Sequence, residues 1–290
     1  MTGMSVIKWF KPKAVVVVSS LLTAGTILFP HQLHAQLPSM SEPPWTGFFS
    51  GYQQRDYEFG INNEGVMELY LMTKKKERVG HTRTIKIYPQ VLIENDQGKR
   101  FYRSLNEDEG FATEIKPSLE HKEVKFTGET KGGVKLEINV KYDRSEIILD
   151  GKVLDKGDIK DPKVYFSYKV KVPAMYTSTY KDEDKAKSRM RKDKVRFIRA
   201  KDGKRVTLKS YEEVDVLAEE NAKDGVRELE VDMDGQEGKK LIFGSLDEKS
   251  TLIFTNRPAD KKGKLWEGYE VLWLREMGDA SAKPFVIEVK

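Results

Sequence analysis

The sequence predicts an all-β protein: an antiparallel β-sandwich, or its larger relative the supersandwich, with few short helices. Three observations predict this class. About a dozen segments alternate apolar and polar residues, turn signals rich in Gly and Asn separate many of them, and few segments carry the apolar stripe of a helix. Neighbouring strands joined by short turns pair antiparallel, so we expect an antiparallel sheet.

The clearest strand signal is residues 134–142, where a polar residue separates each large apolar residue from the next. This two-residue period places the apolar side chains on one face, as in a half-buried strand. Turn signals at 95–98, 131–133, 201–203 and 261–263 punctuate the chain. We expect further strands at residues 66–72, 84–91, 122–126, 147–154, 165–172, 195–198, 226–233, 241–243, 251–255, 269–274 and 285–289.

The segment 161–176 shows the same alternation. One face, which we expect in the core, carries Val164, Phe166, Tyr168, Val170 and Val172. The other face, which we expect to be solvent-exposed and basic, carries Tyr165, Ser167, Lys169 and Lys171. Since Tyr and Lys ordinarily have pKa values of about 10, that face offers no proton exchange near neutral pH.

Two segments depart from the strand pattern. Residues 180–194 are highly charged and lack an apolar stripe, so we expect a surface loop or a short exposed helix there. Residues 210–221 fit a short helix, although Val214-Asp-Val216 also suits a strand.

The N-terminal residues predict an exported protein. Lys8, Lys11 and Lys13 precede an uncharged, mainly apolar run at 14–29, and Ala35 offers a small residue for cleavage. That run is shorter than the ~20 apolar residues that span a bilayer. We therefore expect a signal peptide at 1–35, a periplasmic or extracellular location, and no stable transmembrane segment in the mature chain. The alternative is an uncleaved N-terminal anchor, because the residue three before the cleavage point, Leu33, is large.

We expect the rest of the chain to form one domain. Residues 36–44 contain three prolines and predict an extended leader. A single β-sandwich domain is then expected over 45–290.

Composition excludes several classes of protein. The chain has no cysteine, which excludes disulfides, a thiol nucleophile, Cys-ligated metal sites and a lipid-attached cysteine. The net charge of +5 falls to about +2 without the three lysines of the predicted signal peptide. So balanced a charge on an exported chain makes nucleic acid a poor partner.

The charge is nonetheless unevenly distributed, since residues 181–209 are mainly basic and residues 212–237 mainly acidic. One interpretation is that two solvated segments partly neutralise each other. The other is an anion-binding surface that faces an acidic polysaccharide or another anionic envelope polymer. The residues of that surface would be Arg189, Arg191, Lys192, Lys194 and Arg196.

Several of these patterns resemble, weakly, the galactose mutarotase-like group, which includes aldose epimerases. The pattern Ile61-Asn-Asn-Glu-Gly65 leads into a strand, and the strand at 134–142, the turn at 143–145, the strand at 146–154 and the segment 161–176 are similar to that group in order and spacing. The resemblance implies a β-sandwich that acts on carbohydrate.

The chain departs from that group at one position. Where the group carries a general-acid histidine beside a proline, this chain has Val172 before Pro173. An imidazole exchanges a proton near neutral pH and an isopropyl group does not, so mutarotase chemistry is not expected and a binding role is favoured.

Catalytic and metal-ligating motifs are scarce. His81 and His121 are the histidines of the predicted mature chain; each is read as an exposed residue at a loop or strand entrance, or alternatively as a general base or metal ligand. There is no paired-histidine zinc motif, nucleophile elbow or P-loop. We expect no cofactor and no metal, and an enzyme is less favoured than a binding protein.

Aromatic residues give the positive indication of binding. Sugar rings stack their C–H faces on aromatic planes, although core packing also explains such residues. We expect a ligand-facing edge formed by Arg257, Trp266, Tyr269 and His81. The predicted function is therefore a secreted or periplasmic, non-catalytic carbohydrate-binding or envelope interaction protein. The alternatives are a carbohydrate-active enzyme with a rearranged carboxylate and His81 site, and a structural partner of envelope proteins.

Overall fold

The computed structural model describes residues 35–79, 84–105, 110–173, 184, 188, 190–210, 215–232, 238–245, 251–258 and 266–290. The side chains of Arg257, Pro258, Trp266 and Glu267 are not described. The predicted signal peptide lies outside this part of the chain, except for Ala35. None of the helical residues described here forms a helix long and apolar enough to span a membrane.

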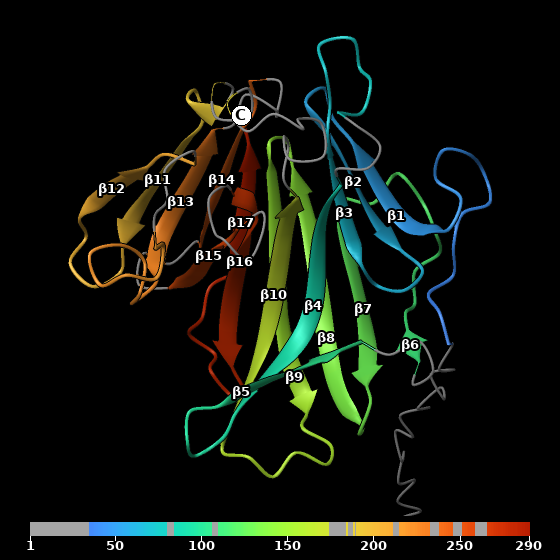
Figure 1. Ribbon diagram of the computed structural model, residues 1–290. Helices are drawn as coiled ribbons and strands as arrows, with labels where there is room; N and C mark the ends of the chain where they lie inside the picture. The colour runs from blue at the N-terminus through green and yellow to red at the C-terminus, as the bar shows by residue number, and fades with distance from the viewer. Residues whose placement is uncertain are drawn as a thin grey trace, which may run out of the picture. The chain divides into compact units, whose positions relative to one another are not determined.

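The described residues form seventeen strands, labelled in Figure 1. The strands are β1 (Phe48–Gln53), β2 (Tyr57–Asn62), β3 (Met67–Leu71), β4 (Ile85–Glu94), β5 (Arg100–Ser104), β6 (Phe111–Ala112), β7 (Glu123–Thr130), β8 (Val134–Asp143), β9 (Glu146–Asp155), β10 (Lys163–Pro173), β11 (Lys194–Arg199), β12 (Arg205–Leu208), β13 (Val226–Asp232), β14 (Lys240–Ser245), β15 (Leu252–Pro258), β16 (Trp266–Glu276) and β17 (Phe285–Val289).

All pairs between these strands are antiparallel, which confirms the predicted fold class. One run, here called the front sheet, has the order β1, β2, β3, β4, β10, β16 and β15, with β5 on the second half of β4. The other, the back sheet, has the order β14, β17, β9, β8, β7 and β6. Strand β13 pairs with both β15 and β14 and so joins the two sheets.

The core lies between the front and back sheets and is dominated by aromatic rings. Trp273 of β16 lies 6.0 Å from Tyr168 of β10 and 6.4 Å, stacked, from Phe285 of β17, measured between ring centroids. The Tyr168 hydroxyl donates a 2.6 Å hydrogen bond to the backbone carbonyl of Asp150 in β9. These contacts fasten β10 and β16 of the front sheet to β9 and β17 of the back sheet, and burial of such rings is a large source of stability.

Close approach of the two sheets requires a glycine at position 151. A Cβ atom placed on Gly151 of β9 would lie only 2.2 Å from Cζ of Phe166 in β10. Any larger residue would therefore have to push that ring out of its place in the core.

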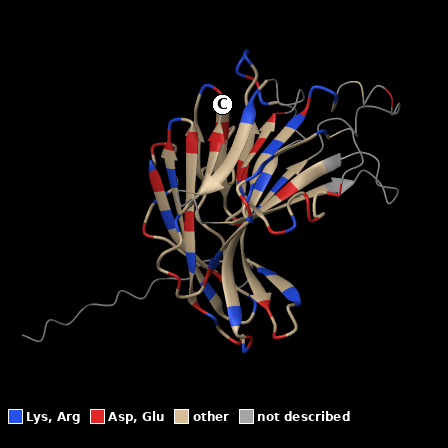
Figure 2. Ribbon diagram, turned by 90° about the vertical axis from the view of Figure 1, so that its left-hand side faces the viewer, with Lys and Arg blue, Asp and Glu red and all other residues tan. Residues whose placement is uncertain are grey.

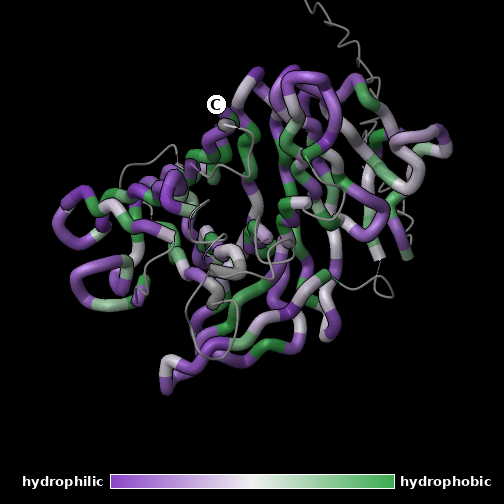
Figure 3. Tube along the Cα trace, turned by 45° about the horizontal axis from the view of Figure 1, so that its top comes forward, coloured by the Kyte–Doolittle hydropathy of each residue, from purple (hydrophilic) through white to green (hydrophobic). Residues whose placement is uncertain are grey.

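Strand β10 confirms half of the expected division of its side chains. Its inward face is buried as predicted, with Val164, Phe166, Tyr168, Val170 and Val172 at most 3% exposed. The prediction for the other face is wrong at its centre, because Ser167 is fully buried there. Two residues of β4 on the same face are buried as well. Gln90, the register partner of Ser167, is 4% exposed, and Leu92 is fully buried. Figure 3 shows that the outlying loops are mainly hydrophilic and that the hydrophobic stretches lie among the central segments.

One further segment differs from expectation, and the predicted leader has contacts that the sequence did not reveal. The described part of the segment predicted as a short helix or strand, Ser210 and residues 215–221, contains neither helix nor strand but mainly turns, and Val216 is buried within it. In the predicted leader, Leu37 is 2% exposed, and its backbone N–H donates to the carbonyl of Asn63 at 2.9 Å. Residues of the leader therefore pack on the sandwich.

Candidate functional site

The candidate site lies on the outer face of the front sheet, meaning the side of β4, β10 and β16 that points away from the back sheet. Because side chains alternate along a strand, residues opposite one another in adjacent strands share a face. Three rows of the outer face follow from the strand register. They are Lys86, Lys171 and Glu270; Tyr88, Lys169 and Leu272; and Gln90, Ser167 and Leu274.

Aromatic rings and lysine side chains meet on this face. The Lys171 Nζ lies 5.1 Å from the ring centroid of Tyr88. The Lys169 Nζ lies 5.7 Å from the ring centroid of Tyr102 in β5 and 3.1 Å from a carboxylate oxygen of Glu270. Tyr102 is 46% exposed. Partial burial raises the pKa of the Tyr102 phenol, which therefore stays neutral and able to donate a hydrogen bond at neutral pH.

Gln90 and Ser167 form a buried polar pair in the middle of the outer face. They are register partners in β4 and β10, and the Gln90 Nε2 and the Ser167 Oγ have no hydrogen-bond partner among the described residues. Leaving such groups buried and unpaired costs about 1–3 kcal/mol each. An unpaired buried polar group in a native protein calls for an explanation, such as a bound water or ion or a role in function.

A cavity of about 280 Å³ opens at one end of this face. The residues that line it include Lys86, Tyr88, Lys171, Val172 and Glu270. It thus contains the position at which the predicted family resemblance would require a histidine. Among the residues that line it, Glu270 supplies the single carboxylate.

A ridge of polar contacts continues the outer face across β3 and β2. The Tyr70 hydroxyl donates to Glu68, and burial together with this hydrogen bond raises the pKa of Tyr70 to about 12. The Arg78 guanidinium lies 3.8 Å from the Tyr70 ring centroid, and its Nε lies 2.6 Å from a carboxylate oxygen of Glu58. Lys86 lies 4.0 Å from Glu68 and so connects the ridge to the cavity on β4 and β10.

The ligand-facing edge predicted from the sequence stays a prediction. His81 lies outside the described residues. Arg257 and Trp266 belong to β15 and β16, but their side chains are not described. Tyr269 is 1% exposed and packs in the core, with its ring centroid 6.2 Å from that of Phe243 and 6.0 Å from that of Phe254.

The oppositely charged segments are in contact with each other, as the first interpretation of their charge expects. Arg196 of β11 forms an ion pair with Glu230 of β13, and Lys194 lies opposite Asp232 in the same strand pair. Lys240 adds contacts at 3.5 Å to Glu230 and 3.8 Å to Asp232. Figure 2 shows basic and acidic residues interspersed over the strands.

The anion-binding role predicted for this surface is a separate question and stays a prediction. Arg191 and Lys192 are exposed, whereas Arg189 lies outside the part of the chain that the structure describes.

The sequence predicted which side chains of β10 share its outer face, but not the residues of other strands that lie beside them in the candidate site. Gln90, Tyr102 and Glu270 come from strands far apart in the sequence, and the alternation within one strand does not reveal its neighbours. The signal that could have found Gln90 is its place in an otherwise apolar stretch between Pro89 and Val91.

No protein-family model matches the sequence, and no curated protein matches it. Among solved structures, the chain is similar to a galactose mutarotase related enzyme from Lactobacillus acidophilus, with 8% identity and a TM-score of 0.43, over 83% of this chain and 96% of that chain. It is also similar to a protein of Synechocystis sp. PCC 6803, with 10% identity and a TM-score of 0.37, over 82% of this chain and 93% of that chain. The weak resemblance predicted from the sequence is confirmed, and at this identity it concerns the fold alone.

Proposed function

We propose that this protein binds carbohydrate on the outer face of β4, β10 and β16, as a non-catalytic binding protein exported to the periplasm or the cell exterior. The observation that carries the proposal is the buried pair of Gln90 and Ser167, beside the rings of Tyr88 and Tyr102. The Gln90 Nε2 and the Ser167 Oγ have no hydrogen-bond partner in the part of the chain that the structure describes. A ligand that contributes hydrogen bonds and apolar surface together would satisfy both features.

Carbohydrate fits this combination of groups. Each sugar hydroxyl both donates and accepts hydrogen bonds, as the amide of Gln90 and the hydroxyl of Ser167 require. The C–H faces of a sugar ring pack on aromatic planes such as the half-exposed ring of Tyr102. Lys169 and Lys171 add charged donors at the rim of the same surface.

The lining of the small cavity favours binding over hydrolysis or epimerisation. A glycosidase uses two carboxyl groups at a defined separation, and Glu270 supplies the single carboxylate among the residues that line this cavity. That carboxylate is already in contact with the Lys169 Nζ, at 3.1 Å. At the position of the histidine expected from the family resemblance, Val172 has no proton to exchange.

The test is direct measurement of saccharide binding by calorimetry, with a panel of neutral and acidic oligosaccharides. Tyr102 and Phe101 form a matched pair, because they are neighbours in β5, are 46% and 44% exposed, and point to opposite sides of the strand. We expect Tyr102→Ala to weaken binding about tenfold and Phe101→Ala to leave it unchanged.

Other results would contradict the proposal. Equal effects of the two β5 variants, or no saturable binding to any saccharide, would reject the outer face as a carbohydrate site. Turnover of a bound saccharide would favour an enzyme instead. Stable co-purification with an envelope protein, without saccharide binding, would favour a structural partner.

Export is proposed from the basic and apolar pattern of residues 8–29. Mass spectrometry of the protein purified from the cell envelope and from the medium should find chains that begin near Gln36. Replacement of Lys8, Lys11 and Lys13 by Glu should lower the exported fraction. Recovery of the protein with residues 1–35 intact from the cytoplasm alone would contradict this part of the proposal.

A further inference from the structure

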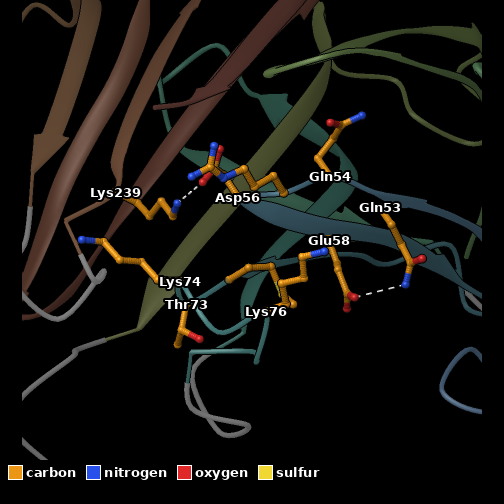
Figure 4. Close-up of a pocket in the computed structure, with 10 residues that line it drawn as sticks. Gln53, Gln54, Asp56, Glu58, Thr73, Lys74, Lys76 and Lys239 are labelled. Carbon is orange, nitrogen blue, oxygen red and sulfur yellow. Dashed lines mark hydrogen bonds and ion pairs between the residues drawn. The ribbon is translucent and has the colours of Figure 1, made fainter.

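A second and larger cavity, of about 630 Å³, lies where the β1–β2 turn, the segment that follows β3 and the start of β14 meet (Figure 4). Figure 4 shows Lys74 and Lys239 on one side of the opening, and Gln53 and Glu58 on the other. The residues that line it are Gln53, Gln54, Arg55, Asp56, Glu58, Met72, Thr73, Lys74, Lys76 and Lys239.

Both carboxylates of the cavity already have cationic partners. Asp56 forms an ion pair with Lys239, which is mostly buried. Glu58 accepts from the Arg78 Nε at 2.6 Å and from the Gln53 Nε2 at 3.1 Å. Lys239 and Arg78 therefore balance the negative charge of the two carboxylates in the lining.

Three cations of the lining have no such compensation. Arg55, Lys74 and Lys76 form no ion pair with any residue in the described part of the chain. All three are exposed at the cavity. Like charges gathered in a concave surface focus a positive potential into it, which attracts an anion.

A hydrogen-bonded turn carries two of these cations. The Thr73 N–H donates to the Glu77 carbonyl at 2.8 Å, and the Lys76 N–H donates to the Thr73 carbonyl at 2.9 Å. The Thr73 Oγ1 accepts from the backbone N–H groups of Lys75 and Glu77, each at 3.2 Å. Lys74 and Lys76 line the cavity, whereas Lys75, between them, does not.

The cavity shares a face with the proposed carbohydrate site. One row of register partners on this face crosses β1, β2 and β3 and consists of Gln53, Glu58 and Tyr70. The adjacent row crosses β3, β4 and β10 and consists of Glu68, Lys86 and Lys171. Strands β2 and β10 are three strand spacings apart, or about 14 Å along the sheet. A short oligosaccharide on β4 and β10 can therefore reach this cavity over the ridge formed by Tyr70 and Arg78.

We propose that this second cavity binds the oxyanion of an acidic carbohydrate, a carboxylate, sulfate or phosphate group, whose sugar rings lie on the outer face. The inference rests on the proposed carbohydrate function and adds the ligand class. Arg55, Lys74 and Lys76 supply the positive charge. Gln53 and Gln54 supply amide groups near the sugar hydroxyls next to the anionic group.

The experiment compares three variants against four probes by calorimetry. The variants are Lys74→Gln/Lys76→Gln, the control Lys75→Gln from the same turn, and Tyr102→Ala from the outer face. The probes are an oligogalacturonate, a sulfated oligosaccharide, a neutral oligosaccharide of the same length and inorganic phosphate.

We expect Lys74→Gln/Lys76→Gln to weaken binding of the acidic probe that the wild type prefers about tenfold. The same variant should flatten the salt dependence of that binding and leave the neutral probe unaffected. Lys75→Gln should behave as the wild type. The carboxylated and sulfated probes identify which oxyanion is preferred.

Three outcomes would overturn the inference. One is unchanged acidic-saccharide binding by Lys74→Gln/Lys76→Gln. Another is tight binding of the neutral probe, sensitive to Tyr102→Ala, with no preference for acidic probes; the proposed function then stands without the anion site. The last is binding of inorganic phosphate but of no saccharide, in which case the proposed function fails as well.

Discussion

Gln90 of β4 and Ser167 of β10 lie directly opposite each other, 4% and 0% exposed, with the Gln90 Nε2 and the Ser167 Oγ unpaired among the described residues. Groups so placed cost free energy in the free protein unless an ordered water binds them. Under the proposed function, a saccharide that reaches and hydrogen-bonds both buried groups would recover this free energy. If carbohydrate binds as proposed, the pair would link the stability of the sheet to ligand binding on the outer face.

The variant Ser167→Ala tests this link. Removing the unpaired hydroxyl should keep the free energy of unfolding or raise it by about 1 kcal/mol, and should weaken saccharide binding. Urea unfolding and calorimetry measure the two effects. A loss of more than about 1 kcal/mol of stability would mean that the hydroxyl has a structural partner.

The variant Gly151→Ala tests the approach of the two sheets. A Cβ atom there would lie 2.2 Å from the Phe166 ring, so we expect a loss of about 1–3 kcal/mol in the free energy of unfolding. Gly244 of β14 is a matched control, since a Cβ on it would meet nothing within 4 Å and its φ is not positive. Gly244→Ala should change the free energy of unfolding by less than about 0.5 kcal/mol. Equal effects of the two variants would show that the sheets are not held at this distance.

The variant Tyr168→Phe removes the hydrogen bond to the Asp150 carbonyl and should cost about 1 kcal/mol at pH 7. Burial raises the pKa of Tyr168 well above its ordinary value of 10.0. A raised pKa contributes stability that is present below the unfolded-state pKa and is lost as the pH rises above it. The deficit of Tyr168→Phe relative to the wild type should therefore shrink above about pH 10. A deficit that stays constant to pH 11 in urea unfolding would contradict the assignment.

The variant Glu94→Gln tests a carboxylate at the end of β4. Hydrogen bonds from Arg100 and Lys163 lower the pKa of Glu94 below its ordinary value. A lowered pKa contributes stability above the ordinary pKa of about 4.3, and this stability is lost as the pH falls through the folded-state value. The urea midpoint of Glu94→Gln should therefore lie below that of the wild type at pH 7, and the two midpoints should converge near pH 3. A difference that is independent of pH would show that charge is not its source.

Sequence alternation predicted most of the strands because a strand with one buried face has to alternate. Strand β17 was predicted with its exact bounds, and β8 to within one residue. The strands β1 and β2 were not predicted, because Gly51 and Gly60 break the alternation of large apolar and polar residues. In the structure the ring of Trp45 lies against Gly51, and the rings of Phe48 and Trp45 lie against Gly60. These glycines are part of the packing, which becomes visible only in three dimensions.

The candidate site was less predictable than the fold. Alternation divides the residues of β10 between two faces, but the neighbours of β10 are β4 and β16, which lie far from it in the sequence. The lysines of β10 suggested a solvated face, yet Ser167 is buried on it, as are Gln90 and Leu92 on the same face of β4. The order of strands, which no local pattern encodes, decides what surrounds a side chain.

The position of β17 has a consequence for how the protein is made. Residues 285–289 form an interior strand of the back sheet, paired with β9 on one side and β14 on the other. Until those residues have left the ribosome, β9 and β14 each have an open edge, and β10 also waits for β16. Pairings that span so much of the sequence form slowly. The sandwich should therefore close only after synthesis has passed residue 289, and a nascent chain stalled before β17 should be cleaved readily by protease.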